Sequence, residues 1–266
     1  MAKQLSPLPD VQVYVTLRPP GMGSVVMTPV NSVLLAVLKT ISSLLPRSVT
    51  DGVEQVVDFA YVRVFGLPFV VLGYRQTGKT TLLEWLRHNM ALLEEFDPDP
   101  TASGGDPVPA FTTKVGDDNM RLRPRRDVGG EYAMWETDWV DLFQQTRPRG
   151  IIFMVDHTNV YHHKDALNFV LQMIDDEPAA RRNLKTFLLL VNKSDLWGED
   201  YSLANLLDDY KNEARRLKSQ SERIGYQYFI RSSSLVSGEG TEEAMREFFN
   251  SIRPKARPVA ESPVYA

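Results

Sequence analysis

The stretch GYRQTGKT, residues 73–80, decides the fold of this chain. It satisfies the pattern G-x-x-x-x-G-K-[ST] at every specified position, and it directly follows a continuous apolar run at residues 69–72. Leucines at helical spacing come next, so the loop joins a buried parallel strand to the amino terminus of a helix. At such a junction, unpaired backbone N–H groups and the positive end of the helix dipole attract an anion. The stretch therefore predicts a phosphate-binding loop.

The residue types in this loop suit a triphosphate. Gly73 and Gly78 permit the backbone to turn around the anion. Lys79 supplies a compact positive charge toward the β and γ phosphates, and the Thr80 hydroxyl can ligate Mg²⁺. The nucleotide contacts that we expect from the loop come from seven residues: Gly73, Gln76, Thr77, Gly78, Lys79, Thr80 and Thr81.

The composition excludes several classes of protein. The 266 residues include 30 Lys and Arg against 34 Asp and Glu, a formal charge of −4, so there is no general attraction to nucleic acid. The chain has no cysteine, which removes disulfide scaffolds and thiolate metal sites, and its four histidines leave little for zinc. The first ten residues lack the pattern of a secretory signal, so we expect a cytoplasmic protein.

Three further apolar runs resemble the one before the loop. They lie at residues 151–155, 187–191 and 226–230, and helical patterns separate them. Strands that alternate with helices form a mostly parallel sheet with helices on both faces, whose ligand site lies at the carboxyl ends of the strands. We therefore expect an α/β fold and divide the chain into four parts: a flexible arm (1–28), an amino-terminal helical extension (29–66), the α/β domain (67–254) and a disordered tail (255–266).

A second motif, NKSD, follows the apolar run at 187–191 and indicates which base is bound. The carboxylate of Asp195 can accept hydrogen bonds from the N1–H and the exocyclic amine of guanine, whereas adenine has neither group in that arrangement. Leaving this carboxylate unpaired against the wrong base costs about 1–3 kcal/mol or more. Asn192, Lys193 and Asp195 therefore predict a guanine-specific loop.

Two weaker signals stand at the expected places in the order of motifs. The segment DVGGE at residues 127–131 offers Asp127, a carboxylate that can hold Mg²⁺, and Gly130, whose N–H can sense a γ phosphate. After the fourth apolar run, a serine-rich segment places Ser234 and Leu235 where they can close over the guanine. We include both pairs among the candidate site residues.

The order GYRQTGKT, DVGGE, NKSD and SSSLVSGEG resembles the small GTPases of the Ras superfamily over about residues 68–253. DVGG with the following Trp135, then GIIFMVD and NKSDL, is most similar to the ADP-ribosylation factor branch. The long segment between Asp195 and Ser234, with a charged helix near residues 201–222, looks more like the β subunit of the signal recognition particle receptor. The resemblance thus makes the α/β domain a P-loop GTPase domain.

This resemblance implies a Mg²⁺-dependent switch that binds GTP and GDP and recruits an effector or complex-partner protein when loaded with GTP. Thr80 and Asp127 would hold the metal, and Lys79, Gly130 and Glu131 would take part in hydrolysis. An exchange factor and an activating protein are further expected partners. Nucleic acid is not expected to be one.

Position 131 departs from the family, where a glutamine usually orients the attacking water. Glu131 adds negative charge beside the γ phosphate and lacks the amide donor, so we predict slow unassisted hydrolysis. The alternative hypothesis is a catalytically silent GTPase-fold subunit of a larger complex with a structural nucleotide. Arg75 fills a loop position that is usually small, and it either points at the triphosphate or faces solvent.

The segment at residues 96–111, rich in proline, occupies the position of the first switch, and we predict that it is mobile. A threonine there normally covers Mg²⁺ in the family. Thr101 lies early, and Thr112 and Thr113 lie where the next strand should begin, so this threonine stays unassigned. Pro124 interrupts the following strand and predicts a bulge.

Apolar residues recur at helical spacing over residues 30–45. Three alternatives stay open for this helix: packing on the GTPase core or on a partner, lying in a membrane interface, and spanning a membrane. Membrane-surface contact through residues 29–45, and with it a peripheral location at a membrane, is therefore one expectation. His162 and His163 have no third ligand at a suitable spacing and are expected at the surface.

Overall fold

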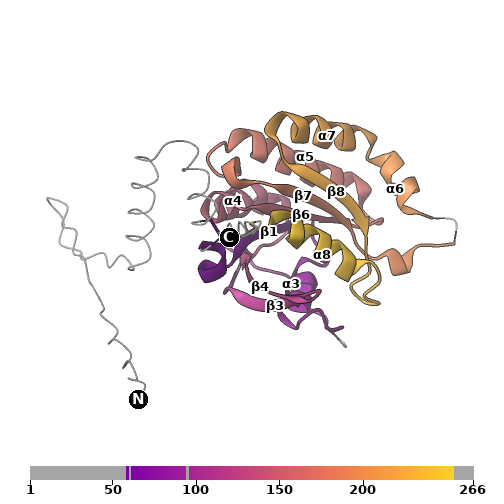
Figure 1. The fold of residues 1–266 in the computed structure, drawn as a ribbon. Coiled ribbons are helices and arrows are strands. Elements are labelled where there is room, and N and C mark those ends of the chain that lie inside the picture. Colours follow the sequence, from indigo (N-terminus) through magenta and orange to yellow (C-terminus); the bar gives the residue numbers. More distant parts are fainter. Residues whose placement is uncertain (1–57, 60, 94–95, 200, 255–266) are drawn as a thin grey trace, which may run out of the picture. The chain divides into compact units, whose positions relative to one another are not determined.

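The computed structural model describes residues 58–59, 61–93, 96–199 and 201–254 (Figure 1). The expected arm (1–28), the helical extension up to residue 57 and the tail (255–266) lie outside the described residues. So does the helix expected at 30–45, and its three alternatives stay predictions. A compact unit extends over Tyr61–Pro254, and it begins with helical residues at 61–65.

Six strands of the described residues form the main sheet, in the order β3-β4-β1-β6-β7-β8. Every neighbouring pair is parallel except β3 and β4, which form an antiparallel hairpin. This arrangement confirms the mostly parallel sheet that the apolar runs predicted. The strand bounds are β1 (Leu67–Gly73), β3 (Phe111–Val115), β4 (Asp118–Arg123), β6 (Gly150–Val155), β7 (Thr186–Val191) and β8 (Gln227–Ser232).

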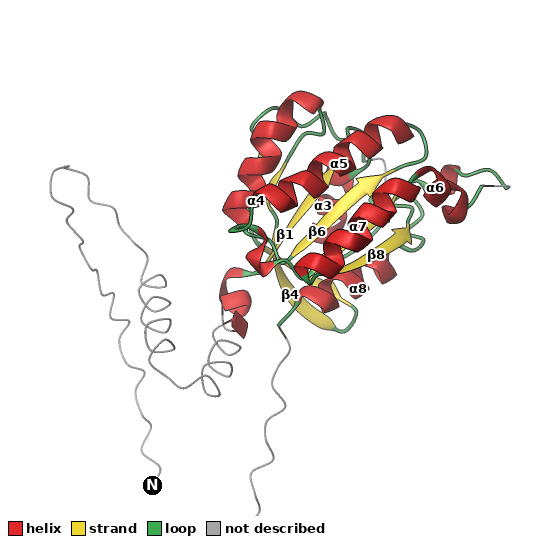
Figure 2. Ribbon diagram, turned by 90° about the horizontal axis from the view of Figure 1, so that it is seen from above, coloured by secondary structure: helices red, strands yellow, loops and turns green. Residues whose placement is uncertain are grey.

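Helices cover both faces of this sheet, as expected (Figure 2). One hydrophobic core joins the sheet to α4, α5, α6 and α7, and the other joins it to α3 and α8. None of the described helices is long and apolar enough to cross a membrane. The helix bounds are α3 (Lys79–Arg87), α4 (Val140–Thr146), α5 (Val160–Asp176), α6 (Leu203–Asp209), α7 (Lys211–Ile224) and α8 (Thr241–Ile252).

Strand β6 shows why the central strands read as continuous apolar runs. Ile151, Phe153 and Val155 belong to the core under α4 and α5, whereas Ile152 and Met154 belong to the core under α3 and α8. Successive side chains of a strand point to opposite faces, so a strand that is covered on both faces must be apolar at every position. The first polar residue then comes at the carboxyl end of the strand.

The strand before Asp127 is interrupted at Pro124, where the structure has a break between two strands rather than the predicted bulge. Strand β4 ends at Arg123, and β5 (Arg125–Asp127) begins one residue later, paired antiparallel with β2 (Asp106–Val108) in a separate two-stranded sheet. The backbone of Arg125 has φ +72°, in the left-handed region. The small sheet carries the chain from β4 to Asp127, next to the phosphate loop.

The charged segment at residues 201–222 forms two helices, so the expectation of one helix was wrong. Ser202 caps α6, and α6 ends at Asp209. Tyr210 separates it from α7, and the Tyr210 ring is fully buried in the core beside α5. A single helix over residues 201–222 would pass Tyr210 without a change of direction. The break between α6 and α7 instead coincides with burial of the Tyr210 ring.

Candidate functional site

The phosphate loop connects β1 to α3, and two glycines make its path possible. A Cβ at Gly73 would lie 2.4 Å from the carbonyl oxygen of Met154, and a Cβ at Gly78 would lie 2.6 Å from Nδ2 of Asn192. Gly78 also has φ +95° and directly precedes α3. Because only glycine fits both the space and the backbone angle, the loop can lie against β6 and the NKSD segment.

Lys79 is the charged group of this loop. It is buried, and its ammonium donates to the carbonyl oxygen of Tyr74 at 3.0 Å. Burial lowers the pKa of Lys79 from 10.5 to about 8, although the carboxylates of Asp127 and Glu131 act in the opposite direction. Thr77 donates to the same carbonyl at 2.9 Å. An anion in the loop would replace this lost solvation, so Lys79 is a phosphate-binding candidate.

Three oxygen-bearing side chains meet beside Lys79. Thr80 Oγ1 donates to Asp127 Oδ2 at 2.5 Å, Thr101 Oγ1 donates to the same oxygen at 3.2 Å, and the two hydroxyl oxygens lie 3.5 Å apart. Asp127 Oδ1 is buried and finds no hydrogen-bond partner within the described part of the chain. Burial raises the pKa of Asp127, although hydrogen bonds from Thr80 lower it. A cation beside this carboxylate would relieve that burial cost.

The donor set of this cluster fits Mg²⁺. Magnesium prefers hydroxyl and carboxylate oxygens, and Asp127 Oδ1 is a buried acceptor that has no protein donor among the described residues. Across all the described residues there is no group of three or more His, Asp or Glu side chains that could hold a metal ion by themselves. Thr101 joins this cluster, whereas Thr112 and Thr113 lie in β3. The sequence left this threonine unassigned because nothing in its spacing indicates the contact.

The DVGG segment packs closely on the phosphate loop. A Cβ at Gly130 would lie 2.3 Å from the backbone nitrogen of Arg75 and 2.4 Å from the carbonyl carbon of Tyr74. The indole of Trp135 donates to the Gly130 carbonyl at 3.1 Å, and the indole of Trp139 donates to that of Gly129 at 2.8 Å. These buried tryptophans therefore hold the segment in place, as core residues rather than as a surface for stacking bases.

Glu131 and Arg75 contact each other at the solvent boundary. A guanidinium nitrogen of Arg75 lies 3.7 Å from Oε1 of Glu131, and both side chains are about half exposed. The guanidinium also lies over the ring of Tyr74, 5.6 Å from its centre. Of the two alternatives for Arg75, the structure shows the side chain at the solvent boundary, paired with the residue that replaces the usual glutamine.

The guanine end of the site is built around the side chain of Asn192. Its Nδ2 donates to the Thr77 carbonyl at 2.9 Å, and its Oδ1 accepts from the backbone N–H of Leu235 at 3.2 Å. The backbone N–H of Ser194 donates to the Ser233 carbonyl at 3.1 Å. Asn192 is buried, so these bonds tie the phosphate loop, the NKSD segment and the loop after β8 together without competition from water.

Most of the predicted residues thus converge at the carboxyl ends of β1, β6, β7 and β8. Asp195 stands in the short helix Ser194–Leu196 with an exposed carboxylate, and Lys193 pairs with Asp156. Gln76 is exposed at φ +60°, and Thr81 lies in the first turn of α3. The structure brings three residues into or beside this region that we had not included among the site residues: Tyr74, Thr101 and Asp156.

The expectation that both histidines lie at the surface was wrong for His163. His162 is exposed and stacks on Tyr74 with ring centres 5.0 Å apart, but His163 is fully buried against Asp156. Burial lowers the pKa of His163, so the ring is neutral at pH 7. No sequence pattern separates the two histidines, because neighbouring residues of a helix point in different directions and only one of them faces the core.

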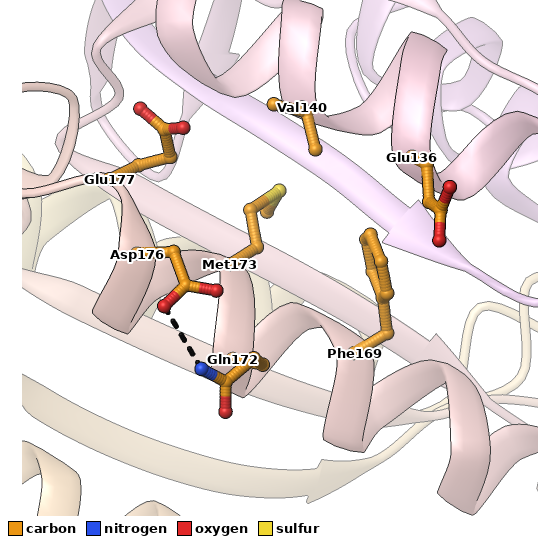
Figure 3. A pocket seen from close by; sticks show the side chains of 7 residues that line it. All are labelled: Glu136, Val140, Phe169, Gln172, Met173, Asp176 and Glu177. Atoms are coloured by element: carbon orange, nitrogen blue, oxygen red, sulfur yellow. Dashed lines mark hydrogen bonds between the residues drawn. The ribbon is translucent and has the colours of Figure 1, made fainter.

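A cavity of about 240 Å³ lies away from this cluster, between α5 and the helical segment that leads from Trp135 into α4 (Figure 3). Phe169 and Met173 of α5 face Val140 across it, and Glu136 belongs to a π-helix at Trp135–Trp139. Glu136, Asp176 and Glu177 form no ion pair with any described residue. None of the predicted site residues lines this cavity, so it does not belong to the nucleotide cluster.

The comparisons with known proteins agree with this fold. No curated protein matches the chain. Among solved structures, the small GTPase Arl6 (BBS3) of Trypanosoma brucei with a bound GppNp analogue is similar, at 19% sequence identity and a TM-score of 0.50. The match covers 71% of this chain and 99% of that one, and it shows the same fold. The sequence model of the ADP-ribosylation factor family matches residues 65–252, most of the chain, and the chain therefore belongs to the ADP-ribosylation factor family of small GTPases.

Proposed function

We propose that this protein is a Mg²⁺-dependent guanine nucleotide switch that binds GTP, hydrolyses it slowly and recruits a partner protein in its GTP state. Membership of the family supports GTP binding in general. The observation that carries the specific proposal is the pair of hydrogen bonds from Asn192 to Thr77 and from Leu235 to Asn192. These bonds support one continuous site, because they join the phosphate loop to the proposed guanine loop.

The chain's own residues divide the work of holding the triphosphate. The N–H groups of the loop and the Lys79 ammonium bind phosphate oxygens. The ammonium donates to the Tyr74 carbonyl in the structure, and a phosphate oxygen would replace this acceptor, so the ammonium stays hydrogen-bonded. Thr80, Thr101 and Asp127 would hold Mg²⁺, which supplies charge neutralisation at the β and γ phosphates when bound. Gly130 lies against Arg75 and Tyr74 of the phosphate loop, and its N–H is the candidate reporter of the γ phosphate.

A nucleotide titration tests the guanine specificity. We expect the wild-type protein to prefer GTP over ATP by about 100-fold or more, because Asp195 is exposed and free to accept both guanine donors. Asp195→Ala should remove most of this preference. Asp141→Ala, which removes an exposed carboxylate of α4, is the matched control and should keep it. Equal affinity of the wild-type protein for GTP and ATP would end the proposal.

Single-turnover hydrolysis tests the slow chemistry. Glu131 lacks the amide donor of glutamine, and its pairing with Arg75 leaves it about half exposed. We expect an unassisted rate at or below the order of 10⁻⁴–10⁻³ s⁻¹, and we expect Glu131→Gln to raise it severalfold. Turnover by the purified protein near the rate of stimulated GTPases, on the order of 10 s⁻¹, would contradict the proposal.

A second candidate is a silent subunit with a structural nucleotide. The close packing of Gly130 on Arg75 and Tyr74 favours it, because a fixed DVGG segment would not report hydrolysis. The nucleotide content of the purified protein separates the two candidates. GTP that survives prolonged incubation at 37 °C with Mg²⁺ indicates a structural nucleotide, whereas conversion to GDP indicates a working switch.

The partners and the location belong to the same proposal. We expect an effector or complex partner, an exchange factor and an activating protein, because slow hydrolysis and tight nucleotide binding need assistance to reset a switch. We also propose a cytoplasmic location with peripheral membrane contact through residues 29–45, because apolar residues recur there at helical spacing. Removal of residues 1–45 should then abolish vesicle binding without changing GTP affinity.

A further inference from the structure

Asp156 is a buried carboxylate at the end of the segment GIIFMVD, and it is not among the predicted site residues. It is 1% exposed and stands one residue beyond β6. The parallel register pairs Val155 with Val191, and the backbone N–H of Asn192 donates to the Val155 carbonyl at 2.8 Å. The sheet therefore places Asp156 beside the beginning of the NKSD segment. A buried carboxylate at this position needs compensation from hydrogen bonds or charge.

The compensation comes chiefly from Lys193. Its ammonium lies 2.7 Å from Asp156 Oδ2, and the other carboxylate oxygen accepts from both the backbone N–H and the hydroxyl of Thr158, at 2.9 and 2.6 Å. Burial alone would raise the pKa of Asp156, but these hydrogen bonds outweigh it and leave the pKa below its usual value. Asp156 is therefore ionised at pH 7, and Thr158 fixes the direction in which its carboxylate points.

Lys193 has few other constraints on its long side chain. Its backbone has φ +64°, and about 30% of the side chain is exposed. The ammonium makes no other ion pair with any described residue. A flexible lysine loses rotamer entropy when it is ordered, so holding its head at one point before the ligand arrives reduces the cost of binding.

We propose that Asp156 is a positioning residue of the nucleotide site, which holds the ammonium of Lys193 so that this lysine is ordered to bind the guanosine part of the nucleotide. The proposal rests on the proposed function. Asp156 touches neither the phosphate loop nor Asp195 in the contacts described, so it acts through Lys193 alone. Nε2 of neutral His163 lies 3.9 Å from Asp156 Oδ1, and its Nδ1 lies 3.1 Å from the carbonyl oxygen of Asp156, so the ring packs on this residue without a competing positive charge.

A double-mutant cycle on the full chain tests this assignment. Asp156→Asn should lower GTP affinity by about 10- to 100-fold, since the lost bond joins two charged groups. Lys193→Met should lower it by a similar factor. If Asp156 acts through Lys193, the double variant should bind GTP no more weakly than Lys193→Met alone. Losses that multiply in the double variant would overturn the proposal.

The affinity for inorganic tripolyphosphate, measured by competition, separates a positioning role from a general structural defect. Tripolyphosphate occupies the phosphate loop but carries no guanosine, so the positioning role predicts that Asp156→Asn changes its affinity by less than about twofold. An equal loss for GTP and for tripolyphosphate would mean a general defect of the site and would overturn the proposal. Asp175→Asn is the matched control, because this carboxylate pairs with Arg181 and Arg223 on another face. It should leave both affinities unchanged.

Thr158→Val is a second variant that tests the same role if Asp156→Asn does not fold. It removes the hydroxyl that donates to Asp156 at 2.6 Å but leaves the carboxylate and its ion pair. We expect a loss of GTP affinity of about threefold, seen only while Lys193 is present. The same loss in the Lys193→Met background would overturn the positioning role. Equal wild-type affinity for GTP and ATP would instead be the failure of the proposed function.

Discussion

The two ends of this candidate site, around Asn192 and around Asp127, are built in different ways, and we call them the guanine end and the magnesium end after the ligands proposed for them. At the guanine end, the buried side chain of Asn192 bonds directly to Thr77 and Leu235, and all three residues follow strands of the main sheet closely. At the magnesium end, Thr101 contacts Asp127 from the loop before β2, and β2 pairs with β5 in a separate sheet of two short strands. The first end is part of the core, whereas the second depends on a small accessory structure.

This difference matters for a switch, because the stability of a protein is not uniform across its fold. The central strands are buried on both faces, whereas Asp106 and Pro107 of β2 are exposed. A short, exposed strand pair opens at a lower free energy than a central strand does. We therefore expect nucleotide-dependent rearrangement at the magnesium end and a constant geometry at the guanine end.

The largest expected effect comes from breaking the guanine end with Asn192→Ala. The change leaves the Thr77 carbonyl and the Leu235 N–H buried without partners, which costs about 2–4 kcal/mol in the free energy of unfolding. Thermal unfolding without nucleotide should show a midpoint lower by about 10 °C. GTP affinity should fall by more than about 100-fold, measured in the range where the variant is folded.

Asn205→Ala is the control for this variant, because Asn205 caps the exposed start of α6 and lies outside the site. It should lower the free energy of unfolding by about 1 kcal/mol or less and keep GTP affinity. If Asn192→Ala were as mild as the control, the guanine end would not be the more rigid of the two, and the comparison would fail.

The second prediction concerns Lys79, which lies between the two ends. Its pKa is lowered from 10.5 to about 8 by burial, so the nucleotide-free folded protein loses this proton at a lower pH than the unfolded chain does. Between pH 8 and 10.5 the unfolded chain binds more protons, and the stability of the nucleotide-free protein should therefore rise with pH across that window. GTP binding needs the ammonium, so GTP affinity should fall above pH 8, with a limiting slope near tenfold per unit.

Isothermal titration at several pH values between 7 and 9 measures this dependence. Lys79→Met removes the titrating group and should bind GTP weakly with no comparable slope over the same range. A wild-type affinity that stays constant to pH 9 would show that the lysine remains charged without nucleotide, contrary to the burial of its side chain.

The same contrast separates what the sequence predicted from what it did not. The central strands could be located because double-sided burial makes them apolar at every position, and the two motifs at their ends carry glycines and polar residues in fixed order. Thr101 could not be assigned, because its contact with Asp127 depends on the register of β2 against β5, which has no periodic signal over three residues. The motifs that mark the site are local in the sequence and could be recognised, whereas the long-range pairing of β2 with β5 could not be predicted.

His163 and Asp156 were missed for a related reason. Two adjacent histidines look alike in a sequence, and the face of α5 that packs on the core decides which one is buried. Asp156 reads as the polar end of a strand, and its pairing with Lys193 requires the parallel register of β6 and β7. Residues at the guanine end therefore also cannot be predicted from the sequence when their role depends on contacts with a neighbouring strand.

The third prediction sharpens the comparison at the magnesium end with Thr101→Val. The variant keeps the shape of the side chain and removes the hydroxyl, whose contacts at 3.2 and 3.5 Å are long. We expect the free energy of unfolding to change by less than about 1 kcal/mol. The Mg²⁺ concentration needed for half-maximal GTP binding should rise about tenfold, measured by titration of nucleotide dissociation against Mg²⁺.

Thr112→Val is the control, because Thr112 lies in β3 and makes no side-chain contact with Asp127. It should leave the Mg²⁺ dependence unchanged. A tenfold effect from Thr112→Val together with none from Thr101→Val would mean that the strand pair β2–β5 shifts when nucleotide binds, and it would give the metal a different threonine.

The smallest expected effect comes from Arg75→Ala at the solvent boundary. The Arg75–Glu131 pair is 3.7 Å apart and about half exposed, so its loss should change the free energy of unfolding by less than about 0.5 kcal/mol. Without Arg75 the negative charge of Glu131 is no longer offset beside the γ phosphate, and hydrolysis should slow by about threefold at low salt and less at high salt. Lys211→Ala, which breaks the exposed pair with Asp208, should change neither quantity. A loss of about 100-fold would mean that Arg75 binds the triphosphate directly, and the magnesium end would then contain a second cation that moves when nucleotide binds.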